Sequence, residues 1–286
     1  MANAIRSWIA PLRTVPRDLW IAWGATFVAF LPIYRPWVVD WQIDPNYSQG
    51  FLIPLISIYL ALRALKDHPD RLSNRPGGAA WIGALLVAIG LAGYVFGTGG
   101  AESFTTRTGF VLTWLGAAWW ISDGSLGRLL AVPTLFLLFS VPVPAVIYYN
   151  LSVPLQTVAA ISASLFLKGV GVPAVRDGNM ILLPGTALEV ADACSGIRSL
   201  TVLLALGALW AYLARGSAAR RAILFACTIP LAVLGNAVRV SLTSLGVYIF
   251  GASVAEGATH EAMGLVVFLV TVTGLYAMSR ILKTDA

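Results

Sequence analysis

The sequence predicts an all-α polytopic membrane protein of about eight transmembrane helices, with one interfacial or re-entrant helix and a short outer β-hairpin. Hydrophobic residues make up 58% of the 286 positions and charged residues only 11%, and the mean hydropathy is +0.80. Soluble domains are about 45–50% apolar and about 25% charged. The apolar residues also gather in runs near the roughly 20 residues that a helix needs to cross a bilayer. We expect residues 1–286 to form a single integral-membrane domain, because no polar linker divides them.

Eight apolar runs come close to the length of a membrane span. They are 18–38, 51–65, 79–97, 107–122, 128–147, 194–213, 221–250 and 261–280. A ninth run, 151–167, includes Ser152 and Gln156 and is of mixed polarity. Because both termini are basic, an even number of spans is required. We therefore predict that run 151–167 lies in the outer interface or re-enters the membrane.

The basic residues set the expected orientation. They occupy the N-terminal segment 1–17, the loops 63–76 and 214–221, and the C-terminus. The positive-inside rule places such segments in the cytoplasm, so the net charge of +6 gives no indication of nucleic-acid binding. The first apolar run lacks a small-x-small cleavage site and is expected to remain as an anchor.

The longest outer segment is expected to be 168–193, which leads to Cys194. Residues 180–183 and 187–190 are short extended runs on either side of Pro184-Gly185. Extended runs around a Pro-Gly turn are typical of a β-hairpin. We predict that this outer hairpin packs on the helices.

Cys194 follows Asp192, a suitable N-cap, at the start of a helix that begins on the outer side. The positive end of the helix dipole favours a thiolate there, and Arg198 lies on the same face four residues later. Ser195 stands beside the thiol and Arg198 below it, which favours a reactive cysteine. The competing interpretation is a small packing residue at the beginning of a helix.

Two further candidates are expected on the same side of the membrane. Arg239 lies about 18 residues after the cytoplasmic edge at Arg221, or about 27 Å along a helix. Asn236 precedes it by one turn as a second donor, although an arginine that reaches the interface and an amide that bonds between helices explain the pair equally. His260 lies just before the last span, where Glu261 or Thr259 is placed to orient it; a solvated loop histidine is the alternative.

Together, these residues supply the roles of a cysteine acyl-transfer site. Cys194 is the candidate nucleophile, His260 the general acid and base, and Arg239 the group that stabilises developing negative charge. One cysteine and one histidine provide only half of a zinc shell, so we predict neither a metal nor a cofactor. Cys227 is expected to be a packing residue on the opposite side of the membrane, too far from Cys194 for a disulfide.

Four motifs resemble those of the exosortase/archaeosortase family of membrane cysteine transpeptidases. The cysteine motif is similar to residues 193–200 (ACSGIRSL), the arginine motif to 236–240 (NAVRV) and the histidine motif to 257–261 (GATHE). Residues 45–54 (PNYSQGFLIP) are similar to the family's amino-terminal Tyr-Ser-His-Gly segment, with Gln49 where histidine is common. The resemblance implies catalytic roles for Cys194, Arg239 and His260, and it makes Tyr47 and Gln49 candidates for substrate contact.

The resemblance also implies a substrate and a place of action. Family members process exported proteins that carry a short C-terminal motif such as Pro-Glu-Pro, a transmembrane helix and a basic tail. The implied location is the bacterial inner membrane, with the site on the periplasmic side and membrane lipids around it. The acceptor is not implied.

Two other functions compete with this one. Arg198, Arg239 and His260 would also suit the phosphate of a lipid carrier, as in an exopolysaccharide-linked phosphatase or transferase that needs no thiol. A transporter or secretion scaffold is the non-enzymatic alternative, although the chain shows no matching half-repeat.

Overall fold

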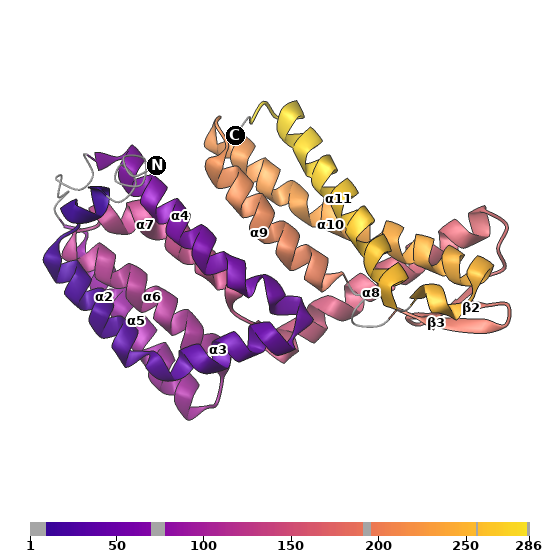
Figure 1. The fold of residues 1–286 in the computed structure, drawn as a ribbon, viewed down its shortest axis with the longest axis horizontal. Helices are drawn as coiled ribbons and strands as arrows, with labels where there is room; N and C mark the ends of the chain where they lie inside the picture. The colour runs from indigo at the N-terminus through magenta and orange to yellow at the C-terminus, as the bar shows by residue number, and fades with distance from the viewer. Residues whose placement is uncertain (1–9, 70–77, 191–195, 256, 285–286) are drawn as a thin grey trace. The chain divides into compact units, whose positions relative to one another are not determined.

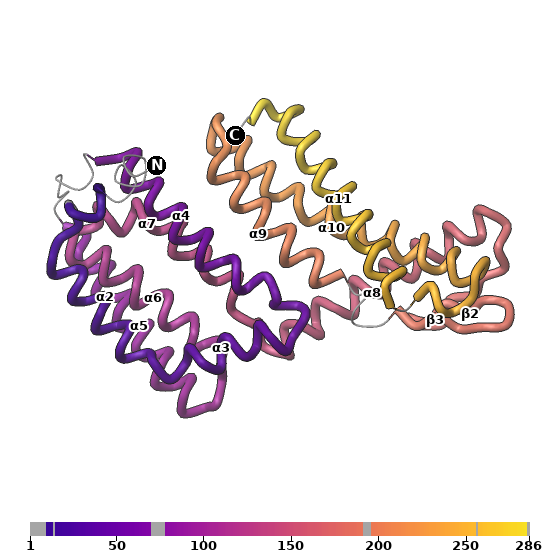
Figure 2. The backbone as a smooth tube through the Cα atoms, in the orientation of Figure 1, coloured from indigo at the N-terminus to yellow at the C-terminus, as the bar shows by residue number. Residues whose placement is uncertain are grey.

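The computed structural model describes residues 10–69, 78–190, 196–255 and 257–284 and shows a mostly helical chain (Figures 1 and 2). The chain forms two compact units, Met1–Pro144 and Ala145–Ala286, a boundary that the sequence analysis did not draw. Each unit is described separately below.

The first unit is entirely helical in its described part. Its elements are η1 (Ala10–Thr14), α2 (Arg17–Ala29), α3 (Leu31–Ile43), η2 (Pro45–Phe51), α4 (Leu52–Asp67), α5 (Ala80–Gly99), α6 (Ser103–Ile121), α7 (Ser125–Phe136) and η4 (Leu137–Ser140). Helices α5 and α6 form its most extensive helix pair (Figure 1). Their backbones touch at glycines, since a Cβ on Gly90 would lie 2.6 Å from the carbonyl oxygen of Gly109.

Two predicted spans of this unit have different bounds in the structure. The run 18–38 is divided at Phe30 into α2 and α3. Pro32, at the start of α3, has no backbone N–H to donate to the last turn of α2, so the helix does not continue through it. The run 128–147 ends at Ser140, since Pro142 and Pro144 interrupt the helix there. Both differences in bounds arise from prolines, which the average hydropathy of an apolar run does not reveal.

The second unit combines helices with a small sheet. Its elements are α8 (Ala145–Gly169), β1 (Val175–Asp177), β2 (Met180–Leu183), β3 (Thr186–Glu189), α9 (Ile197–Leu213), α10 (Ala218–Phe250), η6 (Ala252–Ala255) and α11 (Gly257–Ile281). The long helix α10 contacts α8, α9 and α11. Segment 151–167 is the central part of the 25-residue α8 and does not form a separate short helix.

The predicted hairpin is present with one strand more than expected. The strands are antiparallel in the order β1–β2–β3, and Pro184-Gly185 forms the turn between β2 and β3, with Gly185 at φ +80°. One face of the sheet packs on α8 and α10 through buried residues. These are Ala174, Ile181, Leu183 and Val190 from the sheet region with Ala160, Ala163, Val240 and Val247 from the helices. The apolar alternation of β2 thus fixes the sheet to the helices.

Five described helical segments are long and apolar enough to cross a membrane. They are Pro45–Asp67, Ala80–Gly99, Ala145–Gly169, Ala218–Phe250 and Gly257–Ile281, while Ser125–Ser140 and Ile197–Leu213 are shorter apolar helices. Large apolar side chains on these helices are exposed, such as Phe96 and Val270. The all-α membrane class is confirmed. The total of eight spans stays a prediction, and α8, set apart from the spans in the sequence, is among the five.

Candidate functional site

The predicted site residues are distributed over both units. Tyr47 and Gln49 belong to the first unit, whereas Arg198, Asn236, Arg239, His260 and Glu261 belong to the second. Cys194, Ser195 and Asp192 lie outside the described residues. The prediction of Asp192 as the N-cap was wrong, because α9 begins at Ile197 and its N-cap is Gly196, whose left-handed backbone ends the preceding loop.

Arg239 and Asn236 form a pair on helix α10. Nη2 of Arg239 donates to Oδ1 of Asn236 at 3.0 Å, and Asn236 is buried. Its amide oxygen accepts from the guanidinium, and the predicted role of its amide nitrogen as a second donor beside the arginine stays a prediction. Because the guanidinium is planar, this bond helps to set the direction of its other N–H groups.

The first described residue after segment 191–195 packs against this pair. Gly196 has φ +83°, and a Cβ built on it would lie 2.7 Å from Cγ of Asn236. Gly196 and Asn236 line a small cavity of about 10 Å³ together with Leu155 of α8. The start of α9 is therefore held within contact distance of Asn236.

The first turns of α11 complete the arrangement. Gly264 lies beside Arg239, since a Cβ on it would be 3.8 Å from Nη1. His260 stands one turn earlier and is half-buried, and the charges of Arg239 and of the exposed Glu261 both act on its imidazole. Three helices thus bring the start of α9, Arg239 and His260 together, whereas the side chain of Arg198 is exposed in the first turn of α9.

Gly196→Ala is expected to impair both stability and activity, whereas Gly264→Ala is expected to be tolerated. The first change places a Cβ against Asn236 and forces an L residue into the left-handed region, a strain of about 1–3 kcal/mol. The second places its Cβ at ordinary contact distance. Thermal unfolding in detergent and substrate processing measure both variants; equal behaviour of the two would contradict the packing described here.

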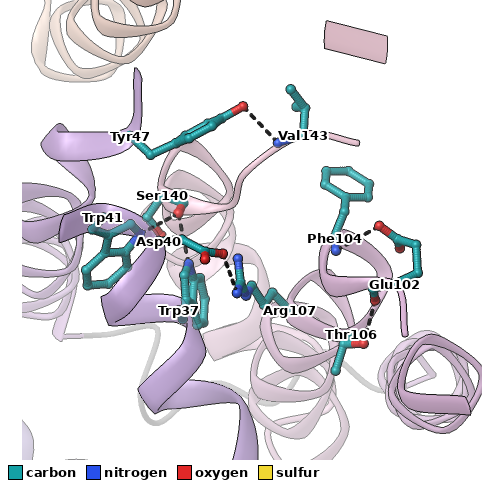
Figure 3. Close-up of polar contacts among 10 residues, drawn as sticks. All are labelled: Trp37, Asp40, Trp41, Tyr47, Glu102, Phe104, Thr106, Arg107, Ser140 and Val143. Carbon is teal, nitrogen blue, oxygen red and sulfur yellow. Dashed lines mark hydrogen bonds and ion pairs between the residues drawn. The ribbon is translucent and has the colours of Figure 1, made fainter. Parts of the chain in front are cut away.

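Tyr47 supports the segment that follows η4 (Figure 3). Its hydroxyl accepts from the backbone N–H of Val143 at 3.1 Å, and its side chain is buried. Trp37 and Trp41 each donate to the carbonyl of Ser140 at 2.8 Å. These contacts give Tyr47 a structural role in addition to the substrate contact predicted from the sequence.

Gln49 contrasts with Tyr47 in its contacts. Both polar atoms of its amide are buried, and neither has a hydrogen-bond partner among the described residues. Leaving such an amide without partners costs about 1–3 kcal/mol. Its position in the motif at 45–54 makes it a candidate for a bond to substrate.

Arg107 is a buried charge that the sequence analysis did not single out. It is 2% exposed, its Nη2 lies 2.6 Å from Oδ2 of Asp40, and its guanidinium lies 5.8 Å from the Trp37 ring centre (Figure 3). Arg107 opens the predicted span 107–122, and Asp40 follows the end of the predicted span 18–38. Ionisable residues at the ends of membrane spans are expected to pair, so an ion pair of Arg107 with an acidic residue was predictable from the sequence.

A cavity of about 220 Å³ lies near this ion pair in the first unit. Its lining includes Pro36, Tyr94, Glu102, Thr106 and Arg107. Burial raises the pKa of Glu102, but hydrogen bonds from Thr105 and Phe104 and the charge of Arg107 outweigh burial and hold this pKa below its usual value. Glu102 also caps α6 by accepting from the backbone N–H groups of Phe104 and Thr105.

Metal ligands do not cluster in the described part of the chain, where no group of three or more His, Cys, Asp or Glu residues is placed to hold an ion. Cys227 is a half-buried free thiol in α10. The polar groups that the described part of the second unit brings together are therefore the guanidinium of Arg239, the amide of Asn236 beside Gly196 and the imidazole of His260.

Comparison with known families matches residues 41–277 to the transmembrane exosortase family. The chain belongs to the transmembrane exosortase family. The resemblance drawn from the four motifs is thereby confirmed, and the match includes all of the predicted site residues. Comparisons with curated proteins and with solved structures gave no match. Membership supports a membrane transpeptidase-type role for this exosortase.

Proposed function

We propose that this exosortase is a cysteine protease and transpeptidase that cleaves the C-terminal sorting signals of exported proteins. The observation that supports it best is the meeting of three helices in the second unit. The start of α9, directly after the Cys194-Ser195 pair, packs on Asn236, which holds Arg239, and the charge of Arg239 acts on His260. Nucleophile, stabiliser and proton carrier are the groups that acyl transfer requires.

The first half of the reaction forms a thioester. The Cys194 thiolate attacks the scissile carbonyl carbon, and the C=O electron pair moves to oxygen. The guanidinium of Arg239, oriented by Asn236, stabilises this oxyanion. When the carbonyl re-forms, the C–N bond breaks, and the imidazolium of His260 gives its proton to the leaving amine. Arg198 favours the thiolate through its charge, as does the start of the helix.

The second half releases the product. The nucleophile of an acceptor, an amine or water, attacks the thioester carbonyl while neutral His260 takes its proton, and the thiolate leaves. Glu261 stabilises the imidazolium through its charge, and Ser195 provides a hydroxyl next to the nucleophile. The proton that His260 takes from the acceptor replaces the one it gave to the leaving amine, so the Cys194 thiolate and the imidazolium are both restored.

The substrate proposed for this site is an exported protein with a short C-terminal motif, a transmembrane helix and a basic tail. His260 lies in the first turn of α11, and Arg239 lies about 27 Å along α10 from Arg221, so both are predicted to lie near the periplasmic boundary. A peptide bond just outside the substrate's own transmembrane helix reaches the same depth. The proposed location is accordingly the bacterial inner membrane, with both termini cytoplasmic and the site on the outer side.

Trapping of the acyl-enzyme tests this proposal. Purified exosortase in proteoliposomes is mixed with a synthetic substrate that carries a Pro-Glu-Pro motif, an apolar helix and a basic tail, then quenched in acid. We expect mass spectrometry to find a hydroxylamine-sensitive acyl group on Cys194. Cleavage with no adduct at Cys194 under single-turnover conditions would overturn the proposal, and release of phosphate from a polyprenyl phosphate instead would favour the lipid-phosphate alternative.

Gln49→His is expected to retain processing, whereas Gln49→Leu is expected to lower it about tenfold, the loss of roughly one hydrogen bond to substrate. Histidine restores the residue common in the family and offers a donor and an acceptor, while leucine has a similar size and offers neither. The measurement is kcat/KM for the synthetic substrate. Equal rates for Gln49→Leu and wild type would remove Gln49 from the substrate site.

A further inference from the structure

Asn179 ties the outer sheet to helix α8. Its Nδ2 donates to Oε1 of Gln156 at 2.5 Å, and its Oδ1 accepts from the hydroxyl of Thr157 at 3.3 Å. Its backbone carbonyl accepts from the N–H of Val190 at 3.0 Å. One residue in a turn therefore joins α8 to the last described residue before segment 191–195.

The partner on α8 is itself fixed in place. Gln156 is 6% exposed, and its Nε2 donates to the hydroxyl of the fully buried Ser152 at 3.1 Å. A buried amide that loses a hydrogen-bond partner stays desolvated with no compensating bond, which is unfavourable. This network therefore favours the side-chain positions in which Asn179, Gln156 and Ser152 remain hydrogen-bonded. The polar residues that give α8 its mixed character thus serve the attachment of the sheet.

Gly196, the first described residue after segment 191–195, lies beside the same part of α8. Leu155, next to Gln156, lines the cavity of about 10 Å³ shared with Gly196 and Asn236. Val190 before the segment and Gly196 after it are therefore both held near residues 155–157. The two anchors differ in kind, because the first is a hydrogen-bond network and the second is close packing on Asn236.

We propose that Asn179 and Gln156 are positioning residues for the nucleophile. They fix the point at which the chain enters the segment that carries Cys194, and Gly196 with Asn236 fixes the point at which it leaves. This inference rests on the proposed role of Cys194. A displacement of about 1 Å at a reacting atom lowers a rate by about 100-fold, so an anchor at Val190, close to the thiol in sequence, has a large effect on kcat.

The test compares four variants in a Cys227→Ala background, so that Cys194 is the only thiol. Asn179→Leu and Gln156→Met remove the bond between the two residues at similar volume. Gln156→Glu keeps an acceptor for Nδ2 of Asn179. Arg176→Met is the matched control, because Arg176 donates to the carbonyl of Gly178 at 2.8 Å and this bond stays within the turn.

Two readouts are measured in proteoliposomes. With the synthetic substrate, we expect Asn179→Leu and Gln156→Met to lower kcat about 10- to 100-fold with KM changed less than about twofold, Gln156→Glu to restore most of the rate, and Arg176→Met to match the parent. Without substrate, iodoacetamide alkylation of Cys194 across the neutral to mildly alkaline pH range should follow a shifted profile in the first two variants only.

Parent-like kcat and alkylation in Asn179→Leu and Gln156→Met would overturn the inference, as would a fall in kcat with an unchanged alkylation profile. If Asn179→Leu does not fold, the comparison of Gln156→Met with Gln156→Glu decides the same question. Failure of the proposed function is recognised separately, because parent protein without cleavage activity still reports the position of the thiol through alkylation.

Discussion

Cys194→Ala is expected to lower kcat/KM for sorting-signal processing by about 10⁴-fold or more. The thiol is the protein group that forms a covalent bond to the substrate in the proposed mechanism, and His260 and Arg239 assist the formation and breakdown of that bond. Cys194→Ser is expected to be nearly as inactive, since a serine hydroxyl, unlike a thiol, is almost entirely un-ionised near neutral pH. Time courses with the synthetic substrate in proteoliposomes measure both variants.

Cys227→Ala is the matched control for this experiment. Cys227 is half-buried in α10 and has no role in the proposed reaction, so its removal is expected to leave kcat/KM within about twofold of wild type, as for most substitutions away from a site. Comparable thermal unfolding of the two alanine variants would exclude loss of fold as the cause. Retained cleavage in Cys194→Ala would eliminate the cysteine mechanism and leave a thiol-independent lipid enzyme as the better hypothesis.

The parts of the fold that were predicted well have strong local signals. Helices α5, α10 and α11 match their predicted runs closely, because long apolar stretches end at polar or basic connections. The turn between β2 and β3 was also predictable, since Pro184 and Gly185 supply the backbone angles that it needs. The helix that carries Arg239 and the one that carries His260 are among these elements.

The parts that were missed depend on contacts distant in sequence. Ser152 and Gln156 lowered the apparent hydropathy of 151–167, and only their network with Asn179 shows why a long apolar helix contains them. The pairing of Arg107 with Asp40 likewise joins residues that local patterns treat separately. Motifs and the positions of polar residues at the ends of apolar runs concern one segment at a time. They indicated the candidate residues but not the distant groups that hold them.

Arg239→Lys is expected to lower kcat about 10²- to 10³-fold while KM changes little, the loss typical of one oxyanion donor. Lysine keeps the positive charge but not the planar fork that Oδ1 of Asn236 orients, so the donor directed at the developing oxyanion is lost. Arg198→Lys is the matched control: its side chain is exposed, and the substitution keeps a cation four residues after Cys194 in the sequence.

Two substitutions of Asn236 distinguish the orientation of the Arg239 guanidinium from its charge. Asn236→Asp keeps an oxygen that accepts from Nη2 of Arg239, whereas Asn236→Leu removes it at similar size. If Arg239 acts through a fixed direction, the leucine variant loses much more of kcat than the aspartate variant, and its defect resembles that of Arg239→Lys. Equal activity of both Asn236 variants together with a severe Arg239→Lys defect would show that the charge position matters and the orienting bond does not. Wild-type rates in Arg239→Lys would show that the directed N–H groups of the guanidinium are not required, because a single positive charge would then suffice to stabilise the transition state.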